Sequence, residues 1–146
     1  MRVRTGEPTH IIIHHSATAD SGTVSWGAIE DYHTKTQGWD DIGYHAGVEL
    51  INNRVYALVG RGLQYEAAAV KESRMNTLAL HVCVVGDYDV VSPSPEVMKV
   101  LAERIVRPWM AQFGIPRYRV LGHRDFASYK SCPGTKFDLV KFRASL

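Results

Sequence analysis

Short runs of hydrophobic residues alternate along the chain with segments that repeat hydrophobic positions every three or four residues. Such runs are typical of buried strands, whereas the longer repeat is typical of helices packed on a core. The runs predict five strands, at residues 10–14, 44–50, 54–59, 77–85 and 118–121. Asn52-Asn53 separates the second and third runs. Asparagine tolerates the left-handed backbone of a tight turn, so these two runs are expected to form a hairpin.

Helical repeats predict three helices. The first follows a capping residue, Thr23 or Ser25, places Trp26 on a hydrophobic face, and ends at Gly38. The third begins near Asp138.

The longest predicted helix begins at Ser94-Pro95-Glu96, which combines a cap, a proline at the first helical position and an early carboxylate. Its core face recurs every four residues, at Val97, Leu101, Ile105, Trp109 and Phe113. Pro108 should kink this helix, because proline removes one backbone donor and crowds the preceding turn.

The order of these elements predicts one domain over residues 1–146, of the α/β or α+β class, with a central mixed β-sheet flanked by helices. Residues 1–8 are expected to form a short N-terminal arm, and residues 60–77 a long loop.

Composition narrows the classes of protein to which the chain can belong. The chain has 146 residues, 45% of them hydrophobic and 22% charged, and a formal net charge of +2. These values are ordinary for a globular protein and argue against a nucleic-acid binder. No apolar run approaches the roughly 20 residues of a membrane helix. The N-terminus lacks the apolar core of a signal peptide, so synthesis in the cytoplasm without such a signal is expected.

The two cysteines differ in context. Cys83 lies within a predicted buried strand, and Cys132 lies in a polar loop before Pro133-Gly134. A disulfide between them is poorly motivated, because isolated buried cysteines usually act as small hydrophobic residues. A reducing compartment, or a metal bound by Cys132, explains better why the chain has only two cysteines.

Three residues are candidate metal ligands. His14 ends one predicted strand, His123 follows another, and Cys132 lies in the loop after it. Two imidazoles and a thiolate suit a catalytic zinc, which has three protein ligands and an open fourth position. The alternative is three unrelated residues, with His14 a core histidine. His15 is adjacent to His14, and only one of the pair can face a metal, because neighbours on a strand point to opposite faces. His81 is expected to be structural.

Two further residues are candidates for catalysis. Lys130 lies two residues before Cys132 and can donate a hydrogen bond to an oxyanion; the alternative is a solvated loop lysine. Tyr44 follows Gly43 at the start of a predicted strand and can project into a cleft; the alternative is a half-buried strand tyrosine. Asp40 and Asp41 are expected to be turn residues.

Taken together, these segments resemble the zinc-dependent N-acetylmuramoyl-L-alanine amidases of type 2. The nearest likeness is to the small bacteriophage lysozyme-type amidases, within a superfamily that includes the peptidoglycan recognition proteins. The stretches that carry the resemblance come in the family's order and are residues 11–18, 38–45, 82–86 and 122–134.

The resemblance implies a mixed sheet with a zinc-containing groove, and hydrolysis of the amide between the lactyl group of N-acetylmuramic acid and L-alanine. Residue by residue, His14, His123 and Cys132 match the zinc ligands, with His14 preferred over His15. Tyr44 and Lys130 match the family's active-site tyrosine and lysine.

The chain departs from the family's pattern after the hairpin. Many relatives have a histidine in a Gly-x-His-Ala segment there, whereas residues 62–70 of this chain contain none. This difference affects peptide binding and removes no metal ligand. Tyr65 or Glu66 is a candidate to replace a substrate contact.

The biological role has several interpretations. A monomeric phage endolysin, released through a holin to act on the periplasmic cell wall, is the favoured one. A bacterial peptidoglycan-recycling amidase shares the same domain. Three more hypotheses are a module that binds peptidoglycan without cutting it, a regulator that binds a phage or host polymerase, and an unrelated zinc hydrolase.

Overall fold

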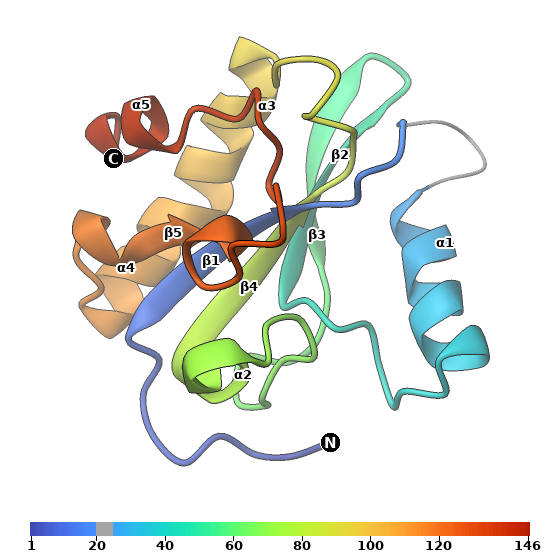
Figure 1. The fold of residues 1–146 in the computed structure, drawn as a ribbon, viewed down its shortest axis with the longest axis vertical. Helices are drawn as coiled ribbons and strands as arrows, with labels where there is room; N and C mark the ends of the chain where they lie inside the picture. The colour runs from blue at the N-terminus through green and yellow to red at the C-terminus, as the bar shows by residue number, and fades with distance from the viewer. Residues whose placement is uncertain (20–24) are drawn as a thin grey trace.

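The computed structural model describes residues 1–19 and 25–146. In this part of the chain the sheet has five strands in the order β3-β2-β4-β1-β5 (Figure 1). All neighbours are parallel except β2 and β3, which form an antiparallel hairpin. The predicted class, a mixed sheet flanked by helices, is therefore confirmed. The strands are β1 (His10–His15), β2 (Ala46–Ile51), β3 (Arg54–Val59), β4 (Ala79–Val84) and β5 (Val120–Gly122).

The helices lie on both sides of this sheet (Figure 1). Helix α1 (Trp26–Asp31) continues into a π-helical turn, Tyr32–Thr36, and helix α2 (Met75–Leu78) directly precedes β4. On the other side, α3 (Pro95–Val100), a π-helical segment (Leu101–Val106) and α4 (Arg107–Phe113) follow one another without a gap, and α5 (Leu139–Ala144) ends the chain. A π-helical segment therefore directly precedes α4, which contains Pro108; the kink expected at Pro108 stays a prediction.

Several predicted boundaries differ from the structure. The strand expected at residues 77–85 begins at Ala79, because residues 75–78 form α2. The strand expected at residues 118–121 begins at Val120, because Arg117–Arg119 is a 3-10 turn. The first hairpin strand begins at Ala46. Residues 60–77 contain helical turns within the expected loop.

The turns and helix caps predicted from local residues agree with the structure better than the predicted element boundaries do. Asn52 and Asn53 have φ angles of 49° and 66°, which confirms the tight hairpin turn. Ser25 caps α1 by accepting a hydrogen bond from the Ala28 amide, whereas Thr23 lies outside the described residues. Ser94 and Asp138 cap α3 and α5 in the same way.

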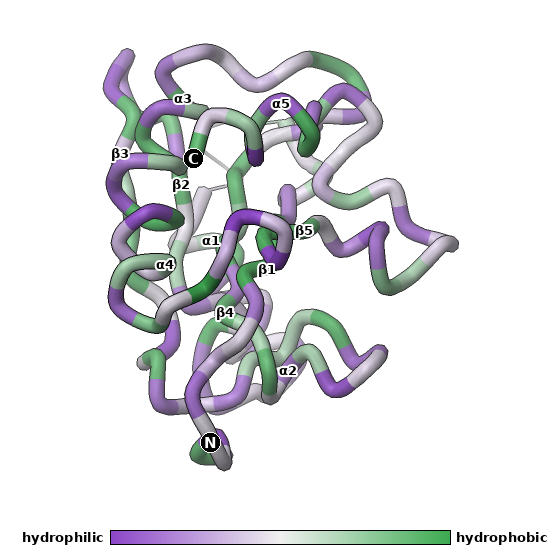
Figure 2. Tube along the Cα trace, turned by 90° about the vertical axis from the view of Figure 1, so that its left-hand side faces the viewer, coloured by the Kyte–Doolittle hydropathy of each residue, from purple (hydrophilic) through white to green (hydrophobic). Residues whose placement is uncertain are grey.

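The two faces of the sheet differ in chemistry. On one face, Ile11 and Ile13 of β1 join Val82 and Val84 of β4 in a hydrophobic core shared with α3, α4 and α5. Figure 2 shows these hydrophobic stretches in the middle of the molecule. Because side chains alternate along a strand, the other face receives His14 from β1 and both His81 and Cys83 from β4. This second face carries the candidate site.

The N-terminal arm is tied to the segment after the hairpin. Val3 forms an isolated bridge with Tyr65. The Arg4 guanidinium donates to the carbonyls of Leu63, Tyr65 and Thr77 at 2.6–3.1 Å.

Within the described residues, no helix is long and apolar enough to cross a bilayer.

Candidate metal centre

The structure brings together the three predicted metal ligands. One ligand atom each from His14, His123 and Cys132 lies within 4.8 Å of the other two. The parallel pairing of β1 with β5 causes this, because it aligns Ile13 with Gly122 and so places the residue after each partner at the same end of the sheet. His14 and Cys132 are buried and His123 is partly exposed, so the cluster opens to solvent on the His123 side.

The loop that carries Cys132 is fixed from two sides. The Arg124 guanidinium donates to the carbonyls of Gly134 and Phe137 at 2.6 and 2.9 Å. The Asp89 carboxylate accepts from the Ser131 hydroxyl and the Thr135 amide, each at 2.8 Å. These contacts flank Cys132 and hold its sulfur where the His15 amide reaches it at 3.4 Å.

Electrostatics suit this cluster to a cation. Burial lowers the pKa of His14 well below its usual value, and the neighbouring His81 and His123 lower it further. His14 is therefore a neutral imidazole with a lone pair available for a metal. Burial raises the pKa of Cys132 to about 11, against the lowering effects of the His15 amide and the Lys130 charge. A buried thiol beside two imidazoles becomes a thiolate readily only when a cation compensates its charge.

The donor set fits zinc. Two imidazole nitrogens and one thiolate match the ligands of catalytic zinc sites, and three ligands leave a fourth position open. That the cluster binds zinc stays a prediction.

His15 lies apart from this cluster, as expected. Its Nδ1 accepts a hydrogen bond from the Tyr88 amide at 3.1 Å, and its ring stacks on Tyr88. The alternation of side chains along β1 thus separates His14 from His15. Both Cys83 and Cys132 are free thiols, which agrees with the expectation that they form no disulfide.

Tyr44 borders the ligands. Its ring centroid is 5.1 Å from that of His14, and Trp26 and His33 surround it at 6.3 and 5.7 Å. Burial raises the pKa of Tyr44 well above its usual value, and the Cys83 sulfur, to which its hydroxyl donates, adds to the rise. The hydroxyl therefore keeps its proton beside the cluster. Its catalytic role stays a prediction.

Lys130 lies on the exposed rim. Its ammonium is 5.8 Å from the centroid of the Tyr129 ring. Its charge nonetheless reaches the site, because it lowers the pKa of both His123 and Cys132. The position is compatible with the predicted contact to a developing oxyanion, which also stays a prediction.

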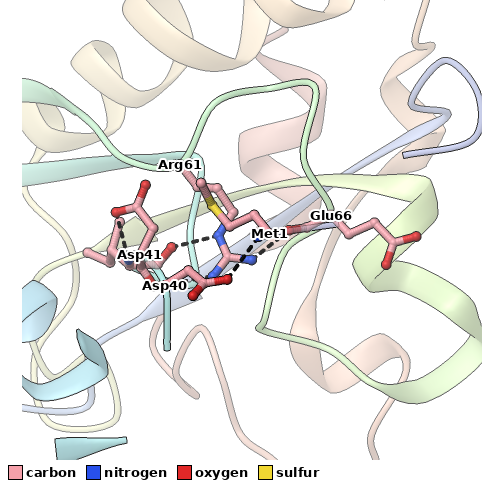
Figure 3. Close-up of polar contacts among 6 residues, drawn as sticks. Met1, Asp40, Asp41, Arg61 and Glu66 are labelled. Carbon is pink, nitrogen blue, oxygen red and sulfur yellow. Dashed lines mark hydrogen bonds and ion pairs between the residues drawn. The ribbon is translucent and has the colours of Figure 1, made fainter. Parts of the chain in front are cut away.

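The segment that carries Tyr44 is held by a buried arginine. Arg61 donates to the carbonyls of Ile42 at 3.0 Å, Glu66 at 2.7 Å and Asp41 at 3.2 Å. Figure 3 shows its guanidinium beside Asp40 and Asp41. Asp41 behaves as the expected turn residue, because its carboxylate accepts from the Ile42 amide at 2.7 Å. Arg61 was not singled out from the sequence, since nothing local marks an arginine as buried.

Asp40 and Glu66 contact the N-terminal arm. The Asp40 carboxylate pairs with the Met1 amino group at 2.8 Å (Figure 3). Glu66 accepts from the Thr77 hydroxyl at 2.9 Å and lies 3.8 Å from Arg2. The Tyr65 carbonyl accepts from Arg4. A substrate contact by Tyr65 or Glu66 stays a prediction.

Two further residues lie near the ligands, and the first of them, Glu72, was not singled out from the sequence. Glu72 accepts a hydrogen bond from the Tyr129 hydroxyl, and its charge raises the pKa of His123. His81, expected to be structural, is hydrogen-bonded to His14 at 2.9 Å. The sequence signal for His81 was its position within a predicted buried strand.

The sequence profile of a family described as "N-acetylmuramoyl-L-alanine amidase" matches residues 4–135. The N-acetylmuramoyl-L-alanine amidase of Sus scrofa is 30% identical over 111 residues, which are 73% of this chain and 17% of that protein. Peptidoglycan-recognition protein LB of Drosophila melanogaster is 26% identical over 136 residues, which are 88% of this chain and 56% of that protein. The chain thus spans little more than half, or much less, of the length of these relatives.

Solved structures share the fold. The endolysin amidase LysCS from Clostridium intestinale superposes with a TM-score of 0.80 at 23% identity, over 99% of this chain and 88% of that one. Drosophila peptidoglycan recognition protein LB superposes with a TM-score of 0.72 at 26% identity, over 92% of this chain and 79% of that one.

Proposed function

The chain belongs to the N-acetylmuramoyl-L-alanine amidase family, and on that premise we propose that it is a zinc-dependent peptidoglycan amidase. It hydrolyses the amide between the lactyl group of N-acetylmuramic acid and L-alanine. The observation that carries this proposal is the convergence of His14, His123 and Cys132 within 4.8 Å, beside the Tyr44 ring. Hydrolysis breaks the C–N bond, leaves a carboxylate on the lactyl group and frees the amino group of alanine.

When bound by the three ligands, zinc supplies a Lewis acid that polarises a carbonyl and activates water. The protein's own groups supply orientation and charge. Tyr44 stays protonated, so its hydroxyl is a source of a hydrogen bond for the water or the intermediate beside the ligands. Lys130 places a positive charge at the open rim, where it stabilises negative charge that develops on the amide oxygen. Buried His14 and Cys132 exclude water from the inner side of the site.

The role as a phage endolysin rests on the resemblance of the sequence, and an endolysin amidase of the same fold supports it. Under this proposal the monomeric protein is made in the cytoplasm and reaches the periplasmic wall through a holin. A recycling amidase acts instead on soluble muropeptides. Comparing activity on intact cell walls with activity on soluble fragments separates the two roles.

A second candidate is recognition of peptidoglycan without cleavage. Structures of the same fold include peptidoglycan recognition proteins bound to tracheal cytotoxin. The complete ligand set of this chain favours the enzyme, because pure recognition does not require an open metal site.

The test is mass spectrometry of muropeptides released from purified cell walls, with and without a chelator. The enzyme should release free peptides that begin with L-alanine, and the chelator should stop this release. Metal analysis should find one zinc per chain in the natural protein and none in Cys132→Ser. Cys83→Ala is the matched thiol control and should keep its zinc. Normal activity in metal-free Cys132→Ser would refute the proposal.

A further inference from the structure

His81 connects the candidate ligand His14 to the backbone. It is fully buried on β4, with 0% of its surface exposed. Its Nδ1 lies 2.9 Å from Nε2 of His14, and its Nε2 lies 2.8 Å from the Met75 carbonyl oxygen. The opposite nitrogen of His14, Nδ1, lies 3.6 Å from the Cys132 sulfur. One line of contacts thus runs from α2 through two imidazoles to the thiol.

The Met75 carbonyl, at one end of this line of contacts, fixes the direction of the hydrogen bonds along it. A carbonyl oxygen only accepts, so Nε2 of His81 must carry the proton. His81 has no exposed surface, and burial disfavours the charged form of an imidazole, so its unprotonated Nδ1 is an acceptor. Nε2 of His14 must then donate to it. A neutral His14 that is protonated on Nε2 has its lone pair on Nδ1, the atom that faces Cys132.

A second imidazole fixes the position of His81. The His81 amide donates to Nδ1 of His45 at 3.0 Å, and Nε2 of His45 lies 2.9 Å from the Tyr65 carbonyl. The same argument assigns the Nε2 proton of His45. The two rings stack with centroids 6.0 Å apart. The Met75 carbonyl therefore holds the His81 ring at Nε2, while the His45 ring holds the His81 backbone amide and stacks on the His81 ring.

We propose that His81 is a positioning residue that selects the tautomer and ring orientation of His14, so that Nδ1 of His14 is the metal ligand. This inference rests on the proposed zinc site. Without an acceptor at His81, the Nε2–H of His14 would be buried without a partner, at a cost of about 1–3 kcal/mol. The ring would then favour the other tautomer, with its proton on Nδ1 and directed at the Cys132 sulfur. That tautomer has no lone pair where zinc must bind.

Two variants separate the hydrogen bond from simple packing. His81→Leu fills a similar volume and has no acceptor. His81→Asn is smaller, yet its side-chain oxygen can occupy the place of Nδ1 and accept from His14. His10→Leu is the matched control, because His10 lies on β1 with its Nδ1 at the adjacent Thr9 hydroxyl and its ring against Phe126.

The first measurement is the ¹⁵N chemical shifts of the histidine rings in the metal-free natural protein. His14 should show a protonated Nε2 and an unprotonated Nδ1. A protonated Nδ1 in His14 would overturn the inference. This result needs no variant, so it stands even where His81→Leu fails to fold.

The second measurement is zinc affinity, by competition with a chromophoric chelator. His81→Leu should bind zinc about 10–100-fold more weakly, the usual effect of removing a partner of a metal-ligating histidine. His81→Asn should recover much of the loss, and His10→Leu should match the natural protein. Equal affinity in His81→Leu, or an equal loss in a folded His81→Asn, would overturn the inference. Failure of the natural protein to bind zinc would refute the proposed function instead, while the ring shifts would still report the tautomer.

Discussion

Replacing Arg61 with methionine should loosen the segment that carries Tyr44. Arg61 is 7% exposed and donates to three backbone carbonyls, those of Asp41, Ile42 and Glu66. Methionine keeps most of the apolar stem and removes all three donors. Because charge-assisted hydrogen bonds contribute about 1.5–3 kcal/mol each and partial access of water offsets some of the loss, we expect a destabilisation of about 3–5 kcal/mol.

The assay is urea unfolding of metal-free protein, which removes the contribution of zinc binding from the comparison. With a slope of about 2 kcal/mol per M, the midpoint should fall by about 1.5–2.5 M. Arg61→Lys should recover only part of this loss, because an ammonium lacks the planar fork that reaches several carbonyls. Arg117→Met is the control at an exposed arginine and should change stability by less than about 0.5 kcal/mol. If Arg61→Met unfolds as late as the control, the reasoning is refuted, because water must then satisfy the three carbonyls.

Three other changes test the surroundings of the site. Gly47→Val should destabilise the protein by about 1–3 kcal/mol, measured by thermal unfolding, because a Cβ at Gly47 would lie 2.4 Å from the Trp26 ring; an unchanged midpoint would show that Trp26 moves freely. Hydrogen bonds from the Thr135 amide and the Ser131 hydroxyl lower the pKa of Asp89, so its contribution to stability is present above the unfolded value of about 3.9 and is lost as the pH falls. The difference in urea midpoint between the natural protein and Asp89→Asn should therefore shrink between pH 6 and pH 3, and a constant difference would contradict this assignment. Tyr44→Phe should keep its zinc and lose about 10²-fold in kcat, measured by release of muropeptides; unchanged kcat would remove the hydroxyl from the mechanism.

Much of the candidate site follows from local pattern. Alternation along a strand separates His14 from His15, and the structure places them on opposite faces of the sheet. Position at strand ends marked His14 and His123, and a polar loop distinguished Cys132 from the buried Cys83. Strand alternation, strand ends and loop polarity each depend on residues that are close in sequence. They can therefore be recognised from the sequence alone.

Errors at the element boundaries have a different cause. Residues 77 and 78 were predicted to start a strand because they lead into one, yet they belong to α2. The Met75 carbonyl in that turn accepts from His81, and the Asn76 side chain accepts from the amides of Ala69 and Val70. These partners come from other segments and outweigh the local preference.

The sequence by itself determined which donor types are present, that only one of two adjacent histidines can face the site, and the class of fold. Tertiary structure alone decided the distances from His14 to two ligands more than 100 residues away, the burial of Arg61 against three carbonyls, and the partner of His81. The physical reason is that hydrogen-bond direction and burial depend on atoms brought close by strand order. The same histidine on β4 would be an ordinary core residue if the Met75 carbonyl and the His14 ring did not lie on either side of it.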